Sequence, residues 1–421
     1  MIPMNIFQNR FSRIAGFLLV FVLVAGLMAA PSLAEPGNVK VGVIVSKTGP
    51  VAFMGRDALM GYEFAVDKVN AAGGIKSLGG AKLELVVGDN ESKPEVGMSE
   101  TERLIKEGVP ILMEGGISSV GFAVTQIAEK YKTPMLVPLS VADPITDRGF
   151  RYVFRLVFKA SWTARDTLEC AKWLGETTGK QPKKIAILNE DTLWGQSTSK
   201  AWKKMIPEYG FEFAGDFPYS KMVQDISPTI SKLKASKPDV VLQCSYLNDA
   251  ILITRTMHEL DFNCMARIPC GGGHSDPRFI ENVKDLADYI LVLHMWHHTI
   301  KGPGTKIQDI NQEYKDIYGE DINDWAAYCY SAIMVLTDAL ERTGSTDREK
   351  IRDALAKTDI NITNSGIIHP FPMRFDETGQ APAVCPVTQI QKDGEFTVWP
   401  PEIAAKKPIY PMPTWSERGL R

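Results

Sequence analysis

The 421-residue sequence has few long apolar runs, few cysteines and almost no excess charge. Beyond residue 34, no apolar run approaches the roughly 20 residues that span a membrane, so we expect a soluble mature protein. The 47 basic and 50 acidic residues give a net charge of −3, which argues against a nucleic-acid partner. The six cysteines are scattered, and their spacing leaves open whether one or two pairs form.

Motifs typical of enzymes are also missing. The segment 116–120 fails the nucleophile-elbow pattern G-x-S-x-G at its last position. The glycine run 271–273 has neither a phosphate-loop lysine nor the spacing of a dinucleotide-binding loop. We therefore predict that the chain is not an enzyme and requires no cofactor.

Residues 1–34 have the features of a cleavable signal peptide. Arg10 and Arg13 give a positive start, residues 14–30 form an uncharged apolar core, and residues 32–34 (Ser-Leu-Ala) offer a small-residue cleavage site. A membrane anchor is the alternative, because the apolar core is long enough to span a bilayer. The polar residues directly after position 34 favour cleavage and export.

The stretch 39–75 predicts a strand, a long loop and a helix. Residues 39–45 (VKVGVIV) are almost all apolar, which suits a strand covered on both faces. A loop follows to Gly55, and from Arg56 apolar residues recur every three or four positions, as on one face of a helix. Ligands of open α/β sheets bind at the carboxyl ends of such strands.

Strands and helices alternate through the next 220 residues or so, and 421 − 34 = 387 residues are enough for two domains. The expected strands are residues 83–88, 109–113, 134–138, 184–189, 211–217, 239–244, a segment near 267, and 288–296. The expected helices are residues 94–107, 118–130, 162–176, 195–209, 226–235 and 248–260. This alternation predicts an α/β protein with two doubly wound, Rossmann-like lobes.

The last third of the chain has a different pattern. Helical periodicity covers residues 306–318, 324–342 and 348–357, and a proline-rich extended tail begins at Phe371. We expect these helices to return to the first lobe, so that the chain crosses between lobes three times. The predicted division is 35–155 with 297–371 as lobe 1, and 156–296 with 372–421 as lobe 2 and a C-terminal arm. Three crossings form a hinge, and a cleft between hinged lobes is a common ligand clamp.

Several segments carry a family resemblance. TGPVAFMGRDALMGYEFAVDKVNAAGGI, followed by LELVVGDNESKPE, resembles the opening of the periplasmic leucine/isoleucine/valine-binding proteins, and RGFRYVFRL, PKKIAILNEDTLWGQS and KPDVVLQCSY extend the likeness along the chain. The resemblance implies a type I periplasmic binding protein fold that works as a monomer.

It also implies a function. Proteins of this kind bind a small carboxylate between the lobes and deliver it to the membrane permease of an ABC importer, from the periplasm. A sensor module that reports ligand occupancy to a signalling system is the alternative, because the same two-lobed unit serves both purposes.

The resemblance places the ligand's carboxylate at the turn that contains Ser118 and Ser119. These serines lie where the helix 118–130 is expected to begin, and the free N–H groups and dipole of a helix N-terminus favour an anion. We expect one of the two serines to cap the helix, and either to contact the ligand.

Two positions depart from the family pattern. Val141 stands where the amino-acid receptors usually have a threonine that meets the ligand, and the adjacent Ser140 could compensate. Gly271 stands where they have the carboxylate that pairs with the ligand's ammonium. Three acidic residues could substitute for it: Asp249, Asp276 and Glu190. Without a substitute, an enclosed ammonium costs about 2–5 kcal/mol, so the expected ligand is an acid without the amino group.

Aromatic and apolar residues complete the predicted site. Trp194 and Tyr246 occupy positions where the family has aromatic ligand contacts, and Phe53 and Met54 lie in the first loop. Such a lining, with few polar groups, is typical of small-molecule sites and suits an aromatic or branched aliphatic carboxylate. Ordinary packing is the alternative for Trp194.

We predict no metal site. His294, His297 and His298 are close in sequence, but if the strand 288–296 continues through them, His297 points away from the other two. No acidic residue or cysteine completes a recognisable ligand spacing along the sequence.

Overall fold

The computed structural model describes residues 37–301, 306–361, 366–368 and 371–420. The predicted signal peptide lies outside these residues and stays a prediction. Among the described helices, none is long and apolar enough to cross a membrane. From Asn38 onward the chain forms one compact unit.

The first parallel sheet has the strand order β2-β1-β3-β4-β5. Its strands are β1 (Val39–Val45), β2 (Leu83–Asp89), β3 (Ile111–Gly115), β4 (Met135–Val137) and β5 (Val153–Arg155). Helices α2 (Ala52–Ala71), α3 (Pro94–Lys106) and α4 (Ser118–Lys130) connect the first four strands. All of β1 except Lys40 is buried, as its apolar sequence predicts for a strand covered on both faces.

The second parallel sheet has the order β7-β6-β8-β9. Its strands are β6 (Lys184–Glu190), β7 (Glu212–Tyr219), β8 (Val240–Cys244) and β9 (Ala266–Pro269). The accompanying helices are α5 (Ala160–Thr178), α6 (Leu193–Glu208), α7 (Ser227–Ala235), α8 (Leu247–Glu259) and the short α9 (Pro277–Val283), which the sequence analysis did not predict.

A third, antiparallel sheet joins segments that are far apart in the sequence. Its order is β10 (Leu291–Leu293), β13 (Val387–Gln391) and β14 (Gly394–Trp399). A bridge between Cys270 and Leu293 connects the end of β9 to β10. A further pair of short strands is β11 (Asp359–Ile360) and β12 (Met373–Arg374), and the 3-10 turns are η1 (Lys76–Leu78), η2 (Asp143–Ile145), η3 (Lys284–Ala287) and η4 (Pro401–Ile403).

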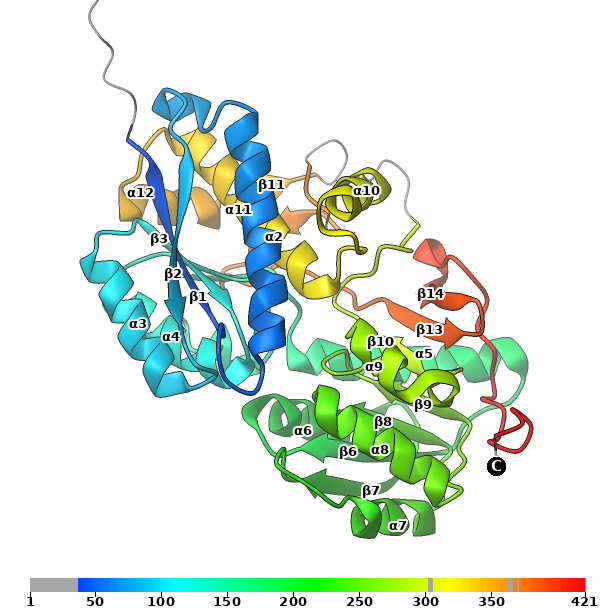
Figure 1. Ribbon diagram of the computed structural model, residues 1–421. Helices are drawn as coiled ribbons and strands as arrows, with labels where there is room; N and C mark the ends of the chain where they lie inside the picture. The colour runs from blue at the N-terminus through cyan, green and yellow to red at the C-terminus, as the bar shows by residue number, and fades with distance from the viewer. Residues whose placement is uncertain (1–36, 302–305, 362–365, 369–370, 421) are drawn as a thin grey trace, which may run out of the picture. The chain divides into compact units, whose positions relative to one another are not determined.

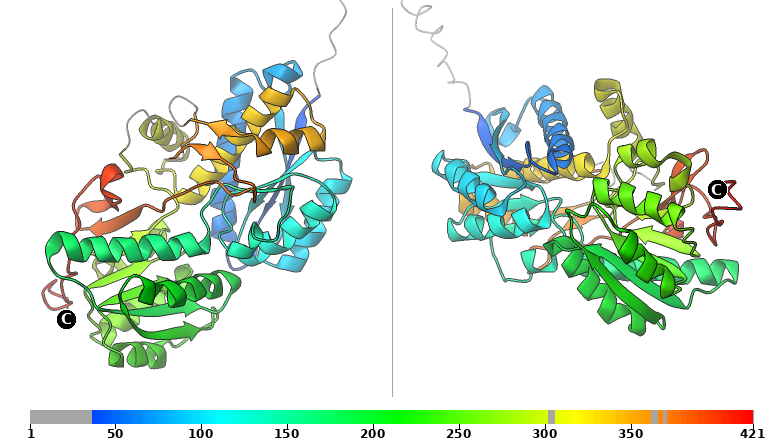
Figure 2. Two further views of the ribbon diagram at one scale, coloured as in Figure 1. Left: turned by 180° about the vertical axis from the view of Figure 1, so that it is seen from behind. Right: turned by 60° about the horizontal axis from the view of Figure 1, so that its bottom comes forward.

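The C-terminal helices are α10 (Ile307–Tyr318), α11 (Asp324–Thr343) and α12 (Arg348–Ala356). Helix α11 runs beside α2 of the first sheet (Figures 1 and 2). The two backbones are so close that a Cβ on Gly61 would lie 2.2 Å from the carbonyl oxygen of Ala326. Glu341 also accepts hydrogen bonds from the N–H groups of Lys76 and Ser77. Helix α11 therefore returns to the first sheet, whereas the exact lobe boundaries stay a prediction.

The fold class predicted from the sequence is confirmed, but several element boundaries differ by a few residues, and two of these differences have a clear physical reason. Helix α2 begins at Ala52 rather than Arg56, because Gly55 lies inside its first turn: a Cβ there would lie 2.1 Å from the Ser46 carbonyl oxygen, so the glycine permits close packing. Strand β10 ends at Leu293 rather than Trp296, since Met295 N–H turns away toward a side-chain oxygen of Asp324 at 3.4 Å. The histidines at 294–298 are therefore outside the strand.

Candidate functional site

A cavity lies at the carboxyl ends of strands from both parallel sheets, with an empty volume of about 530 Å³. The first sheet and α2 contribute Met54, Gly116, Ile117, Ser118, Leu139 and Val141. The second sheet contributes Trp194, Tyr246, Cys270, Gly271 and Gly272. The remaining wall residues are Phe158, Thr163, Leu293, Met295, Asp324 and Trp325. Most of these side chains are apolar, as in other small-molecule sites.

The polar part of the wall is the turn between β3 and α4. Helix α4 begins at Ser118, and its N-cap residue is Ile117, with no side-chain cap, so the predicted serine cap is wrong. The Ser118 hydroxyl oxygen instead accepts hydrogen bonds from the N–H groups of Val141 and Ala142, at 3.2 and 3.3 Å. Its own proton remains able to donate into the cavity, beside N–H groups that the first turn of a helix leaves unpaired.

Glu114 lies beneath this turn and is fully buried. One of its carboxyl oxygens accepts hydrogen bonds from Gly116 N–H, at 2.6 Å, and from the Ser140 hydroxyl, at 2.8 Å. Burial raises the pKa of Glu114 to about 7. Because Ser140 is turned toward Glu114, it supports the turn from below and does not line the cavity.

The opposite part of the wall is aromatic. Trp194, in the first turn of α6, lies beside Tyr246, which precedes α8, with ring centroids 5.2 Å apart and planes inclined at 58°. Gly272 has a φ of +58°, and a Cβ there would lie 2.5 Å from the Trp194 ring. A glycine at this position therefore lets the indole pack closely against the loop after β9.

The three carboxylates considered as substitutes at Gly271 all have other partners. Asp249 accepts from the Tyr219 hydroxyl at 2.5 Å and from Tyr246 N–H at 3.1 Å. Asp276 pairs with Arg278 and accepts its N–H, and Glu190 accepts from the N–H groups of Thr192 and Gly195. None of the three lines the cavity. Gly271 itself contributes only backbone, at a φ of +43°.

One acidic residue that was not predicted from the sequence also lines the cavity, Asp324. It is the first residue of α11 and is 2% exposed. One carboxyl oxygen lies 3.5 Å from Nδ1 of His294, whereas the other, Oδ1, is buried without a hydrogen-bond partner among the described residues. No sequence pattern marks this position, because only the packing of α11 along α2 brings it to the cavity.

Of the nine predicted ligand contacts, six line the cavity: Met54, Ser118, Val141, Trp194, Tyr246 and Gly271. Besides Ser140, Phe53 and Ser119 do not. The Phe53 ring packs on Trp325, with centroids 5.5 Å apart, beneath the guanidinium of Arg278 at 4.5 Å. Whether these residues touch a ligand stays a prediction. None of the six cysteines forms a disulfide, and Cys244 is a buried residue of β8.

The chain folds as a type I periplasmic binding protein: two parallel α/β sheets contribute the carboxyl ends of their strands to one cavity. It belongs to the periplasmic binding protein family, whose sequence profile matches residues 38–395. The predicted resemblance to leucine/isoleucine/valine-binding proteins is thereby confirmed. Proteins of this family are binding components of transport systems.

Known proteins resemble the chain over nearly its full length. The Leu/Ile/Val-binding protein homolog 7 of Brucella suis biovar 1 is 28% identical over 400 residues, which cover 92% of this chain and 97% of that protein. The crystal structure of the leucine binding protein LivK from Thermotoga maritima superposes with a TM-score of 0.74 at 26% identity, covering 85% of this chain and 97% of LivK.

A third relative was solved with an aromatic ligand. It is a solute binding protein of an ABC transporter from Rhodopseudomonas palustris BisB5 in complex with 3,4-dihydroxy benzoic acid. It superposes with a TM-score of 0.73 at 22% identity, covering 86% of this chain and 95% of that one. At this identity the likeness shows the fold alone.

Proposed function

We propose that the protein is the solute-binding component of an ABC importer for an aromatic or branched aliphatic carboxylate that lacks the α-ammonium. The observation that carries this proposal is the division of the cavity wall. The turn at Ser118 offers hydrogen-bond donors to a carboxylate, and the rest of the wall is largely apolar.

The wall opposite the turn argues against an α-amino acid. Gly271 has no side chain to pair with an ammonium, and the nearby Asp249 and Glu190 already accept hydrogen bonds from their own surroundings. An ammonium held beside Gly271, with no partner from these residues, costs several kcal/mol (about 2–5). Val141 likewise offers no hydroxyl.

Asp324 refines the proposal. Its buried Oδ1 lacks a donor, and a buried acceptor without a partner is costly, by about 1–3 kcal/mol. A hydroxyl group on the ligand, away from the ligand's carboxylate, would donate a hydrogen bond to Asp324 Oδ1. The ligand then needs no α-ammonium to satisfy this oxygen. The Rhodopseudomonas palustris relative was crystallised with a benzoic acid that carries two hydroxyl groups, a ligand of this chemistry.

A matched ligand series tests the proposal. Isothermal titration calorimetry would compare leucine with 4-methylpentanoate, which has the same side chain without the amino group, and benzoate with 4-hydroxybenzoate. We expect each deaminated or hydroxylated acid to bind at least about tenfold more tightly than its counterpart, a difference of 1.4 kcal/mol. Leucine or isoleucine as the tightest ligand would contradict the proposal.

The Asp324→Asn variant separates the role of Asp324 from that of the turn at Ser118, called the carboxylate turn because it is proposed to hold the ligand's carboxylate. We expect it to bind benzoate as the wild type does and to lose the preference for 4-hydroxybenzoate. An unchanged preference would remove Asp324 from ligand recognition. Recovery of each ligand unchanged after incubation checks that the protein performs no chemistry on it.

Transport and location need separate measurements. We propose that residues 1–34 are removed on export and that the mature protein works in the periplasm with a membrane permease. N-terminal sequencing of protein released by osmotic shock should begin at Glu35. Deleting the gene should abolish uptake of the labelled ligand; if uptake persists and a transcriptional response to the ligand is lost, the protein serves a sensor.

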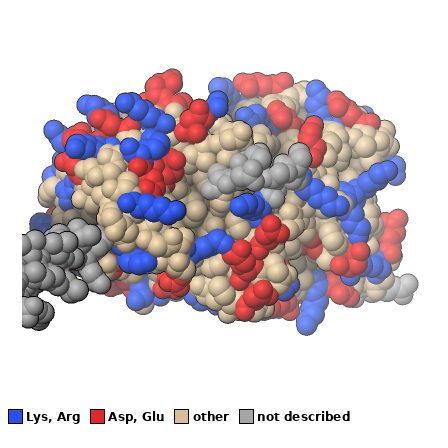
Figure 3. All heavy atoms as spheres, turned by 90° about the horizontal axis from the view of Figure 1, so that it is seen from above, with Lys and Arg blue, Asp and Glu red and all other residues tan. Residues whose placement is uncertain are grey.

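Figure 3 shows basic and acidic side chains interspersed on one face.

A further inference from the structure

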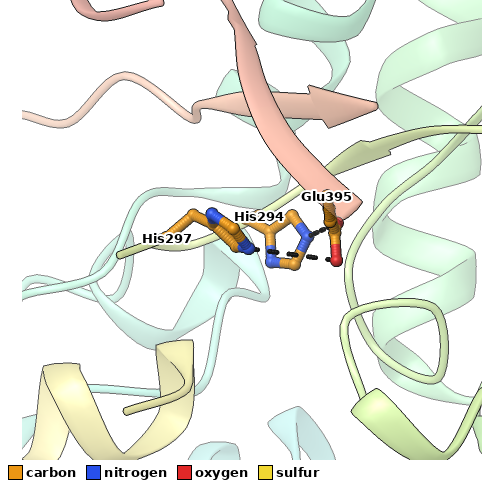
Figure 4. A group of neighbouring side chains, drawn as sticks. All are labelled: His294, His297 and Glu395. Atoms are coloured by element: carbon orange, nitrogen blue, oxygen red, sulfur yellow. Dashed lines mark hydrogen bonds and ion pairs between the residues drawn. The ribbon is translucent and has the colours of Figure 1, made fainter. Parts of the chain in front are cut away.

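His294, His297 and Glu395 form a cluster outside the cavity described above. His294 and His297 follow β10, and Glu395 is the second residue of β14, so the fold brings together residues about a hundred positions apart (Figure 4). One ligand atom from each lies within 4.8 Å of the others. The histidines would point to opposite faces only if the strand continued through them, but β10 ends at Leu293.

The distances suit a metal ion of the size and preference of zinc. Zinc bonds to histidine nitrogen and carboxylate oxygen are about 2.0–2.2 Å long, so tetrahedral ligands lie roughly 3.4 Å from one another. Nε2 of His294 lies 2.7 Å from one Glu395 oxygen, and Nε2 of His297 lies 3.9 Å from the other. One zinc ion would bind all three atoms if these separations, which all lie within 4.8 Å, shifted to about 3.4 Å.

Both imidazoles also have the outer hydrogen-bond partners that metal-bound histidines use to orient the ring. Nδ1 of His294 faces Asp324 Oδ2 at 3.5 Å. Nδ1 of His297 lies 2.8 Å from the Thr299 hydroxyl and also accepts the Thr299 N–H at 3.3 Å. Zinc binding through Nε2 therefore requires the ring's proton to move to Nδ1, with the Thr299 hydroxyl as its acceptor in place of the N–H contact. In each ring, therefore, Nε2 is the nitrogen that points to Glu395.

The cluster is reachable from solvent. His294, His297 and Glu395 line a groove with an empty volume of about 2340 Å³, which is separate from the ligand cavity except for the shared Asp324. Two histidines and one carboxylate leave a fourth zinc position, which water from the groove can occupy. An access route and an open position complete the requirements for a metal site.

We propose that His294, His297 and Glu395 bind one divalent transition-metal ion, with zinc as the best match. The alternative is an ion pair between His294 and Glu395 alone. An ion pair between His294 and Glu395 does not explain why Nε2 of His297 also faces the Glu395 carboxylate, at 3.9 Å. Bound zinc would join the end of β10 to β14 and, through His294, contact Asp324 in the wall of the cavity. The proposal does not depend on the proposed transport function.

Zinc binding to the mature protein, produced without a histidine tag and stripped with a chelator, tests the site. Titration calorimetry with zinc chloride and metal analysis after gel filtration should give one zinc per chain. We expect His297→Asn to weaken zinc binding at least about tenfold, and the melting temperature to rise with zinc in the wild type only. Wild-type protein that retains no zinc would overturn the proposal.

Two further variants keep the test decisive. Glu395→Gln should also weaken zinc binding, and circular dichroism will show whether it is folded, since Glu395 also accepts from the Thr388 hydroxyl. His258→Asn is the control, because His258 lies on α8 beside Trp415, away from the cluster. If His297→Asn and Glu395→Gln bind zinc as tightly as the control does, the zinc lies elsewhere and the proposal fails.

Discussion

The two sides of the ligand cavity differ in what they offer. The turn before α4 provides the Ser118 hydroxyl and the unpaired N–H groups of a helix N-terminus, fixed in place by hydrogen bonds to the next loop. The loop after β9 provides Gly271 and Gly272, with no side chain, and seats the indole of Trp194 against the backbone. The first side can hold an anion, whereas the second mainly sets the shape of the space.

This difference explains why family membership alone does not give the ligand. In an α-amino acid the carboxylate and the ammonium are adjacent, so recognition needs an anion site and a cation site close together. The first side offers the donors that an anion site needs, and the second side has no carboxylate at Gly271. Asp324, from a helix of the C-terminal third, is the acidic side chain that lines the cavity.

The largest expected effect comes from filling the glycine beneath Trp194. Gly272→Ala places a methyl group 2.5 Å from the indole and 2.6 Å from the Ser245 carbonyl oxygen, at a φ of +58°. We expect a loss of about 3 kcal/mol in the free energy of unfolding and a displaced Trp194. Chemical denaturation followed by tryptophan fluorescence measures both.

Gly210→Ala is the matched control for this substitution. Gly210 also has a positive φ, +81°, but a Cβ there meets nothing within 4 Å, so only the backbone strain of about 1 kcal/mol remains. Equal losses in the two variants would mean that close packing against Trp194 contributes nothing.

The buried carboxyl beneath the turn predicts a pH dependence of stability. The folded-state pKa of Glu114 is raised from 4.5 to about 7, so the neutral form is favoured in the folded protein. Its contribution to stability is fully present below pH 4.5 and is lost as the pH rises through 7, by up to roughly 3 kcal/mol. We expect Glu114→Gln to stabilise the protein at pH 8.5 and to change little at pH 4.5.

Urea denaturation at the two pH values measures this change, with the exposed Glu377→Gln as the control. Asp57 and Asp249, whose pKa values burial raises to about 6 and about 7, should leave a residual slope in the variant. A Glu114→Gln protein with the same pH dependence as the wild type would show that Glu114 is ionised in both states.

The carboxylate turn itself can be tested by separating its two serines. Ser118 lines the cavity, whereas Ser119 does not. We expect Ser118→Ala to weaken benzoate binding by about 2 kcal/mol, or roughly 30-fold, because it removes a hydrogen bond to a charged group. Ser119→Ala and the exposed Ser99→Ala should change affinity less than about twofold, a difference of roughly 0.4 kcal/mol.

Calorimetry with the ligand found in the matched series gives the affinities. Equal losses for Ser118→Ala and Ser119→Ala would mean that the helix N-terminus acts as a whole. Unchanged affinity in both variants would mean that the turn does not bind the ligand's carboxylate. The proposed difference between an anion-binding side and a shape-setting side of the cavity would then be wrong.

The smallest effect would come from restoring the missing carboxylate. Aspartate tolerates the left-handed backbone conformation of Gly271, and its Cβ would lie 3.2 Å from the Leu293 carbonyl oxygen. We expect Gly271→Asp to improve the affinity for leucine relative to 4-methylpentanoate by about tenfold, or 1.4 kcal/mol. The Gly271→Asn variant has the same shape without the charge and should show no such gain.

Much of the fold could be predicted from local pattern. The apolar runs of β1 and β6 and the helical periodicity of α4 and α11 gave element starts that the structure retains, because burial on both faces or on one stripe leaves a direct mark in the sequence. The boundary of α2 was wrong because Gly55, a loop residue by composition, serves close packing. The end of β10 was wrong because a contact with Asp324 redirects the chain.

The sequence by itself determined the class of protein, the alternation of strands and helices, and six residues that line the cavity. Only the tertiary structure decided how the polar groups are used: Ser118 braces a neighbouring loop, Ser140 supports Glu114, and Asp324 reaches the cavity. It also brought Glu395 to His294 and His297. Periodicity records burial along one segment, whereas the cavity joins segments as far apart as Met54 and Asp324, which are 324 − 54 = 270 positions apart.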